Sequence, residues 1–241
     1  MIIIPARIGS SRFPNKVLAD VGGLPMVIRT AKAVESIDRV AIATDSKEVI
    51  DIATSYGITA IMTSKEHNSG TDRIYEAAKE LKLDDDEIII NVQGDEPFIE
   101  EKVVRAVYDL TFKNRYNLNI MMNSCYKIMD NPQADDPNIV KVVTNKNNIA
   151  LYFSRAKTPY PRDHHFNEYK GHLGIYGFTK KSLETFCNLS IAPLEEIEKL
   201  EQLRALYHGY NIAMVEVETK SFGIDTFEDL EKSLKIHCLH N

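Results

Sequence analysis

Residues 2–16 read IIIPARIGSSRFPNK, a short apolar run that leads into a basic loop. The isoleucines predict a strand buried on both faces, and Gly9 with the serines after it predicts a turn. The loop carries Arg7, Arg12 and Lys16 and no acidic residue. Backbone N–H groups and cationic side chains at the carboxyl end of a strand favour phosphate binding. The spacing matches neither the dinucleotide-binding glycine fingerprint nor the Walker A motif, and the alternative is a basic surface loop without a ligand.

Apolar runs alternate with helical patterns through the first half of the chain. We expect strands at 2–4, 39–44, 58–62 and 88–92, and helices at 26–36, 47–56, 72–81 and 101–112. This alternation predicts an α/β fold with a mainly parallel sheet and helices on both faces. Asp45 and Glu48 are spaced like a capping box at the start of the second helix.

The second half is less regular. We expect a β-rich insertion at residues 119–178 within a single domain that spans residues 1–241. Its strands are expected at 120–126, 139–143 and 173–178, and they are followed by a long amphipathic helix at 194–207, a strand at 213–217 and a helix at 229–236.

Composition narrows the class of protein. The 241 residues are 44% hydrophobic and 27% charged, which is typical of a globular protein. The net charge of −6 argues against binding to nucleic acid. No apolar run approaches the ~20 residues of a membrane span, and the N-terminus lacks the pattern of a signal peptide. The three cysteines are far apart, so we expect reduced thiols and a cytoplasmic location.

Asp95 lies in the sequence NVQGDEP at residues 91–97, directly after an expected buried strand. Ligands of open α/β sheets bind at the carboxyl ends of strands, so this carboxylate is expected to face the phosphate loop. Mg²⁺ favours one or two protein carboxylates together with phosphate oxygens and water. The alternative is a turn before Pro97.

Asp225 offers a second carboxylate, just before a helix whose start is predicted by Thr226 and Asp229. Ser69 and Gly70 form another turn that leads into a helix with Arg73, and this turn is a candidate for contacts with a nucleotide base or ribose. For both segments the alternative is a plain helix cap.

A further set of polar residues lies in apolar or helical surroundings. Each is individually more typical of a structural role, but together they are suited to an anionic, polyhydroxylated substrate whose carboxylate pairs with an arginine. The set consists of Arg155, His172, Tyr176, Glu201 and Gln202.

The chain resembles the 3-deoxy-manno-octulosonate cytidylyltransferases over essentially its whole length. The first motif and QGDEP alone indicate a sugar nucleotidyltransferase, whereas the later motifs are more specific to this family. Besides residues 2–16 and 91–97, the matching stretches are HNSGTDR (67–73), ALYFSRA (150–156), GHLGIYGF (171–178), LEEIEKLEQLRAL (194–206) and GIDTFEDL (223–230). Asn15 stands where many members of the family have glycine.

The resemblance implies a Rossmann-like nucleotidyltransferase fold with a smaller β-rich part for sugar binding and dimerisation. It implies that CTP and 3-deoxy-manno-octulosonate (Kdo) react to CMP-Kdo and diphosphate for lipopolysaccharide biosynthesis, in a homodimer. Relatives that act on 8-amino-Kdo or sialic acid, and a nucleotide-binding module without turnover, are the alternatives. By resemblance, Arg7, Ser11 and Lys16 bind triphosphate, Asp95 and Asp225 hold Mg²⁺, and Gln93, Arg155, His172, Tyr176, Glu201 and Gln202 face the sugar.

Overall fold

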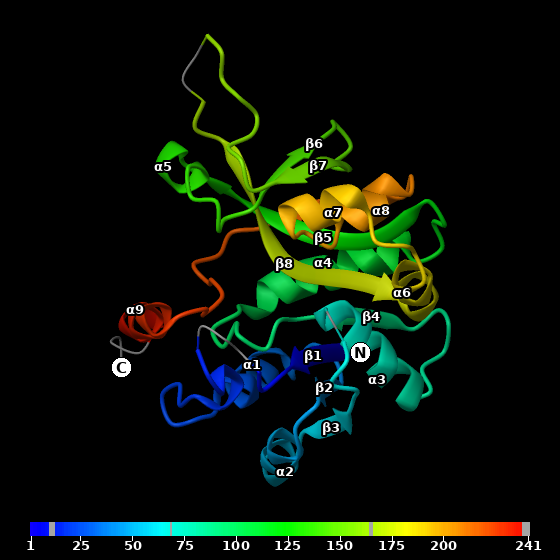
Figure 1. Ribbon diagram of the computed structural model, residues 1–241, viewed down its shortest axis with the longest axis vertical. Coiled ribbons are helices and arrows are strands. Elements are labelled where there is room, and N and C mark those ends of the chain that lie inside the picture. The colour runs from blue at the N-terminus through cyan, green and yellow to red at the C-terminus, as the bar shows by residue number, and fades with distance from the viewer. Residues whose placement is uncertain (10–12, 68, 164–165, 238–241) are drawn as a thin grey trace.

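A computed structural model describes residues 1–9, 13–67, 69–163 and 166–237. Among these residues, nine strands form one sheet, whose main path has the order β3-β2-β1-β4-β8-β5-β9. The parallel strands of the first half and the long strands of the second half lie in two adjoining parts of Figure 1. None of the described helices has the length and apolar composition that spanning a bilayer requires.

The first half of the chain builds the parallel part of the sheet. Its strands are β1 (Ile2–Ala6), β2 (Val40–Thr44), β3 (Thr59–Met62) and β4 (Ile88–Asn91). β1 pairs in parallel with β2 on one side and with β4 on the other, so the order of strands reverses between β1 and β4. Such a switch point opens a crevice at the carboxyl ends of the two strands.

The second half extends the same sheet with long strands. β8 (Tyr169–Thr179) pairs antiparallel with β4 and with β5 (Ile120–Met129). β9 (Asn211–Glu216) pairs in parallel with β5, and β6 (Lys141–Thr144) and β7 (Ala150–Ser154) form a hairpin beside β8. The sheet is therefore mixed, with its parallel strands around β1 as predicted.

Helices cover both faces of the sheet because alternate residues of β1 point in opposite directions. Ile2 and Ile4 pack in one cluster with apolar residues of α1 (Met26–Val34), α2 (Lys47–Ser55) and α4 (Glu101–Asn114). Ile3 packs in a second cluster with α3 (Gly70–Glu80) and α6 (Lys180–Cys187). The predicted α/β arrangement with two covered faces is confirmed.

Several local predictions were wrong. The expected helix at 194–207 is two helices, α7 (Pro193–Glu198) and α8 (Leu203–Tyr207), because Lys199 adopts a left-handed conformation with φ of 54°. Asp45 does not cap α2. The cap is Ser46, whose hydroxyl accepts a hydrogen bond from the Val49 N–H. The strand β7 and the helices α5 (Asn131–Ala134) and α6 were not expected.

Candidate active site

Three residues distant in sequence converge at the carboxyl ends of β1 and β4. Lys16 begins the short 3-10 helix η1 (Lys16–Leu18), Asp95 follows β4, and Asp225 precedes α9 (Phe227–His237). The Lys16 Nζ lies 2.6 Å from the Asp95 Oδ2 and 3.0 Å from the Asp225 Oδ1. The proximity of the two aspartates, which sequence spacing alone does not establish, is thus a property of the fold.

Backbone contacts bring these segments together. Gly94 allows the chain after β4 to approach β1, because a Cβ at this position would lie 2.9 Å from the Pro5 carbonyl oxygen. The Ile224 N–H donates to the Asp95 carbonyl oxygen at 2.9 Å, which fixes the segment that carries the second aspartate.

The start of α9 is stabilised as predicted. The Asp229 Oδ2 accepts from the Thr226 N–H at 2.9 Å, and the Thr226 Oγ1 accepts from the Asp229 N–H at 3.1 Å. The Asp229 Oδ2 also accepts from the Asp225 N–H at 3.1 Å. This reciprocal cap orients the backbone that presents the Asp225 carboxylate.

Asn15 sets up the position of Lys16. Its φ of 55° lies in the left-handed region, which suits glycine and is better tolerated by asparagine than by most residues. The replacement of glycine by asparagine therefore retains the turn before Lys16.

The electrostatics of this cluster favour a bound cation. Burial by itself would lower the pKa of Lys16, but the Asp95 and Asp225 carboxylates outweigh burial and raise it. Two carboxylates that converge on one positive charge form the kind of donor set that Mg²⁺ uses together with phosphate oxygens and water. Within the described ranges, no group of three or more His, Cys, Asp or Glu side chains is arranged to hold a metal ion.

Glu96 is a buried carboxyl next to this cluster that sequence reasoning missed as a site residue. Burial, with the neighbouring Asp95 charge, raises its pKa to about 7. Lys127 faces it from β5, and burial lowers the pKa of that amine. Its place directly after Asp95, at the carboxyl end of a buried strand, is the sequence signal that could have identified it.

The predicted nucleotide residues surround the carboxyl end of β1. Arg7 is exposed just after the strand. The Ser69 Oγ accepts from the Asp72 N–H at 3.1 Å and so caps α3. A Cβ at Gly70 would lie 3.1 Å from the Pro5 Cγ, so the amino end of α3 packs closely against β1. Ser11 lies outside the described residues.

Arg73 takes a different position from the other nucleotide candidates. It is buried, and its guanidinium donates to the Thr63 Oγ1 at 2.6 Å and the Asp45 Oδ2 at 3.1 Å. These bonds connect α3 to the ends of β2 and β3. A direct contact between Arg73 and a nucleotide stays a prediction.

Most of the predicted sugar residues meet between β4, β8 and α8. The Gln93 Nε2 donates to the Gly174 carbonyl oxygen at 3.1 Å, and the rings of His172 and Tyr176 lie 5.4 Å apart. The Thr71 hydroxyl donates to the Glu201 Oε1 at 2.5 Å, which connects this group to the start of α3. Burial lowers the pKa of His172 to about 3, so its imidazole is neutral at pH 7.

Buried polar atoms in this region are without a hydrogen-bond partner among the described residues. They are the Asn91 Nδ2, the Glu201 Oε2 and the Gln202 Nε2. Burial also raises the pKa of Glu201, and burial together with Glu201 raises that of Tyr176. Such unpaired groups are typical of sites that bind polar ligands.

Arg155 lies at the end of β7. Its Nε donates to the Glu198 carbonyl oxygen at 2.7 Å and its Nη1 to the Pro137 carbonyl oxygen at 3.1 Å. The guanidinium thus donates to neutral carbonyl oxygens, while the Glu198 Oε2 accepts from the backbone N–H of Arg155 at 2.9 Å. Its contact with a sugar carboxylate stays a prediction.

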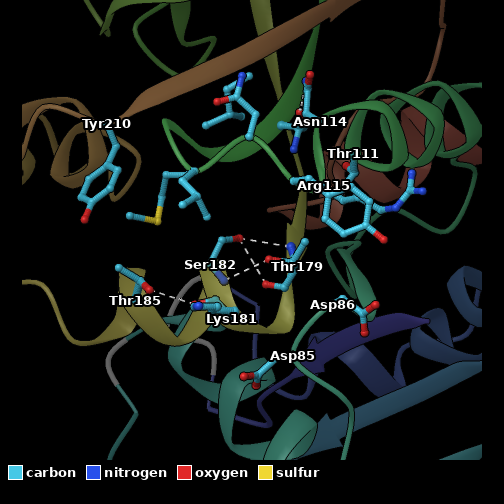
Figure 2. Close-up of a pocket in the computed structure, with 16 residues that line it drawn as sticks. Asp85, Asp86, Thr111, Asn114, Arg115, Thr179, Lys181, Ser182, Thr185 and Tyr210 are labelled. Carbon is cyan, nitrogen blue, oxygen red and sulfur yellow. Dashed lines mark hydrogen bonds between the residues drawn. The ribbon is translucent and has the colours of Figure 1, made fainter.

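A separate cavity of about 480 Å³ lies between α4, α6 and the start of β5. Figure 2 shows Asn114, Arg115, Thr179 and Ser182 around it. Thr179 pairs with Ile88 at the amino end of β4, whereas Asp95 follows the carboxyl end of that strand. The cavity is therefore at the opposite end of the sheet and contains none of the predicted site residues.

Known proteins are similar to this chain in both sequence and fold. The family model of cytidylyltransferases matches residues 1–217. A 3-deoxy-manno-octulosonate cytidylyltransferase of a Nitratiruptor species is 57% identical over 232 residues, which cover 96% of this chain and 97% of the relative. The chain belongs to the 3-deoxy-manno-octulosonate cytidylyltransferase family.

Other members of the 3-deoxy-manno-octulosonate cytidylyltransferase family are similarly close. The protein so named from Wolinella succinogenes is 50% identical, with 98% of each chain covered. A solved structure of CMP:2-keto-3-deoxy-manno-octonic acid synthetase complexed with CTP superposes with a TM-score of 0.92 at 36% identity, and covers 100% of this chain and 98% of that chain. A glucose-1-phosphate thymidylyltransferase from Bacillus anthracis, at 18% identity and a TM-score of 0.66, shares the fold alone.

Proposed function

We propose that this chain transfers the cytidylyl group of CTP to Kdo and forms CMP-Kdo and diphosphate, the activated sugar for lipopolysaccharide biosynthesis. The observation that carries the proposal is the identity of 57% over nearly the whole chain to a relative of that name. The fold alone would not suffice, because one fold can host several nucleotidyltransferase reactions.

The reaction requires positioning and charge stabilisation. The anomeric hydroxyl of Kdo loses its proton to solvent and attacks the α-phosphorus of CTP. The bond from that phosphorus to the bridging oxygen breaks, and diphosphate leaves with the electron pair. A transfer of this kind depends on in-line alignment and on offsetting negative charge. A covalent enzyme intermediate is not needed.

The triphosphate would bind at the carboxyl end of β1. Arg7 and Lys16 supply positive charge there, and Ser11 belongs to the same loop by sequence. The amino end of α3, which is capped by Ser69 and where Gly70 packs against Pro5, adds the positive end of a helix dipole beside the nucleotide.

Asp95 and Asp225 would hold Mg²⁺, since their oxygens already converge on one cation. When bound, Mg²⁺ supplies Lewis acidity and lowers the pKa of the attacking hydroxyl. Mg²⁺ with two aspartates fits the preference of this ion for few protein ligands.

The sugar would occupy the region lined by Gln93, Tyr176, His172 and the start of α8. Neutral His172 can exchange hydrogen bonds with sugar hydroxyls without adding charge. The unpaired Glu201 Oε2 and Gln202 Nε2 provide an acceptor and a donor for them. Arg155 would pair with the sugar carboxylate.

We also propose that the protein is a homodimer and that it is located in the cytoplasm. Apolar side chains are exposed around β7 and α7, among them Leu151 at 58% and Ile197 at 76%. Large apolar side chains that are exposed in a single chain can become buried in an interface between copies of it.

The test measures product formation by the purified protein with CTP and Mg²⁺ across Kdo, 8-amino-Kdo and sialic acid. We expect CMP-Kdo and diphosphate in equal amounts, with Kdo the preferred sugar and CTP preferred over UTP. Equal turnover of sialic acid, a preference for UTP, or CTP binding without turnover would contradict the proposal. Higher kcat/KM for 8-amino-Kdo would correct the sugar while leaving the reaction in place.

A further inference from the structure

The Lys16 ammonium occupies the position between the two carboxylates. It lies within hydrogen-bond distance of both the Asp95 Oδ2 and the Asp225 Oδ1. The Lys16 side chain is 11% exposed, whereas that of Asp225 is 48% exposed. A solvent-accessible carboxylate thus closes over a largely buried ammonium.

This arrangement offsets the repulsion between the aspartates. Two carboxylates that both contact one ammonium repel each other, and this repulsion destabilises the fold unless a cation lies between them. A divalent cation held by Asp95 and Asp225 would need the oxygens that Lys16 now contacts. Ammonium and metal ion are therefore competitors for one set of ligands.

We propose that Lys16 is the resident counter-ion of the divalent-cation site and that it exchanges with the metal ion when substrate binds. A lysine ammonium is suited to this exchange because it is a point charge on a flexible four-carbon stem. The destination of the released ammonium, the triphosphate of CTP, rests on the proposed function.

The exchange couples two binding events. Without nucleotide, a metal ion must displace Lys16 and leave its charge without a partner, so binding is weak. With a triphosphate present, Lys16 gains an anionic partner when it leaves the aspartates. Metal and nucleotide then increase each other's affinity, and by linkage they do so by the same factor.

The test measures Mn²⁺ binding to the nucleotide-free protein by electron paramagnetic resonance. Lys16→Met removes the competing charge while retaining the length of the side chain. We expect Lys16→Met to bind Mn²⁺ at least roughly tenfold more tightly than the wild type. The matched control is Lys47→Met, which removes a charge from an exposed pair with Asp51 and should leave Mn²⁺ affinity unchanged.

Equal or weaker Mn²⁺ binding by Lys16→Met would overturn the proposal. Thermal melting provides a second measurement, because the loss of the ammonium contacted by both aspartates should lower the Tm of Lys16→Met, and Mn²⁺ should raise it more than in the wild type. If Lys16→Met folds only when Mn²⁺ is added, the proposal is supported, and if added Mn²⁺ does not rescue folding, it is overturned.

These measurements contain neither CTP nor Kdo, so they separate this inference from the proposed function. A wild type that forms CMP-Kdo, combined with no gain in Mn²⁺ affinity for Lys16→Met, would reject the counter-ion alone. A gain in Mn²⁺ affinity without transferase activity in the wild type would reject the reaction and retain the counter-ion.

Discussion

Asp225 is a single residue through which the proposed Mg²⁺ site can be tested. Its carboxylate reaches Lys16 from a segment that is 130 positions from Asp95 in the chain. By sequence alone, a turn was the alternative for Asp95 and a helix cap the alternative for Asp225. The convergence of the two aspartates on the Lys16 ammonium favours a metal site over those alternatives.

We predict that Asp225→Asn lowers kcat by a factor on the order of 10²–10³, as expected for the loss of one stabilising contact in the transition state. The amide is close to isosteric but carries no charge for the metal ion. CTP should retain Arg7 and Lys16, so its affinity should change less than kcat. Steady-state kinetics with thermal melting check this.

The control for Asp225→Asn is Asp51→Asn, which neutralises an exposed carboxylate in a pair with Lys47. We expect wild-type kinetics for the control. A kcat of Asp225→Asn close to the wild-type value would mean that this residue is only part of the helix start.

Glu96 gives a prediction for the dependence of stability on pH. Its pKa rises from 4.5 to about 7 in the folded protein, chiefly through burial. The folded state therefore retains a proton that the unfolded state loses, and stability falls as the pH rises from about 4.5 to 7. Above this window the effect reaches about 3 kcal/mol, since one pKa unit corresponds to about 1.4 kcal/mol.

Glu96→Gln should remove this dependence because the amide does not titrate. Denaturant unfolding in EDTA should show the variant gaining stability relative to the wild type between pH 5 and pH 8. A difference between the two proteins that is the same at both values of pH would show that Glu96 does not bind a proton in this range.

At the scale of elements, hydrophobic pattern predicted most of the parallel sheet and its helices. Strands such as β1 and β4 are buried on both faces, and their continuous apolar runs make them visible in the sequence. The break at Lys199 was not visible, since the apolar spacing of 194–207 continues across a left-handed residue. β7 was missed because Leu151 and Tyr152 give no clear alternation between buried and exposed positions.

The capping residue of α2 was also not predictable from local sequence. Asp45 and Ser46 are both good capping residues, and local sequence does not decide between them. Asp45 instead accepts a hydrogen bond from Arg73, a residue 28 positions away in α3. Contacts between residues distant in sequence also form the candidate site, where the Thr71 hydroxyl donates to the Glu201 carboxylate across 130 positions.

The close approach of β1 and the loop after β4 is testable through Gly94. Gly94→Ala places a methyl group 2.9 Å from the Pro5 carbonyl oxygen, so the backbone must shift. We expect a loss of about 1–3 kcal/mol in the free energy of unfolding, as for overpacking, together with reduced activity. Denaturant unfolding measures the first and diphosphate release the second.

Gly174→Ala is the stability control for Gly94→Ala, because its methyl group would lie 3.7 Å from the Gln93 Cγ, an ordinary contact. The control should lose much less stability than Gly94→Ala. Equal losses would show that the approach to Pro5 does not constrain residue 94.

At the scale of the whole molecule, the sheet brings the two halves of the chain to one site. β4 and β8 are neighbours, so residues of the parallel part and of the β-rich part face the same region. The order of strands was not predictable in detail, since nothing local in the sequence fixes β8 beside β4. The resemblance to a family supplied the identity of the site residues that pattern alone left open.

We predict that the protein is a homodimer in solution. Light scattering at micromolar concentration should give twice the mass of 27.3 kDa calculated for the chain. Leu151→Asp should shift the protein toward monomer by placing a charge in the proposed interface. Leu118→Asp, at an 80% exposed position beside the cavity at the other end of the sheet, should leave the dimer intact. A monomeric wild type would reject the prediction.

A crystal structure of the protein with CTP and Mg²⁺ would test the proposed site most directly. We predict the triphosphate at the carboxyl end of β1 beside Arg7 and Lys16, with Mg²⁺ on Asp95 and Asp225 and the Lys16 ammonium on phosphate oxygens. Nucleotide bound in the cavity between α4 and α6, with Lys16 still on both aspartates, would contradict it.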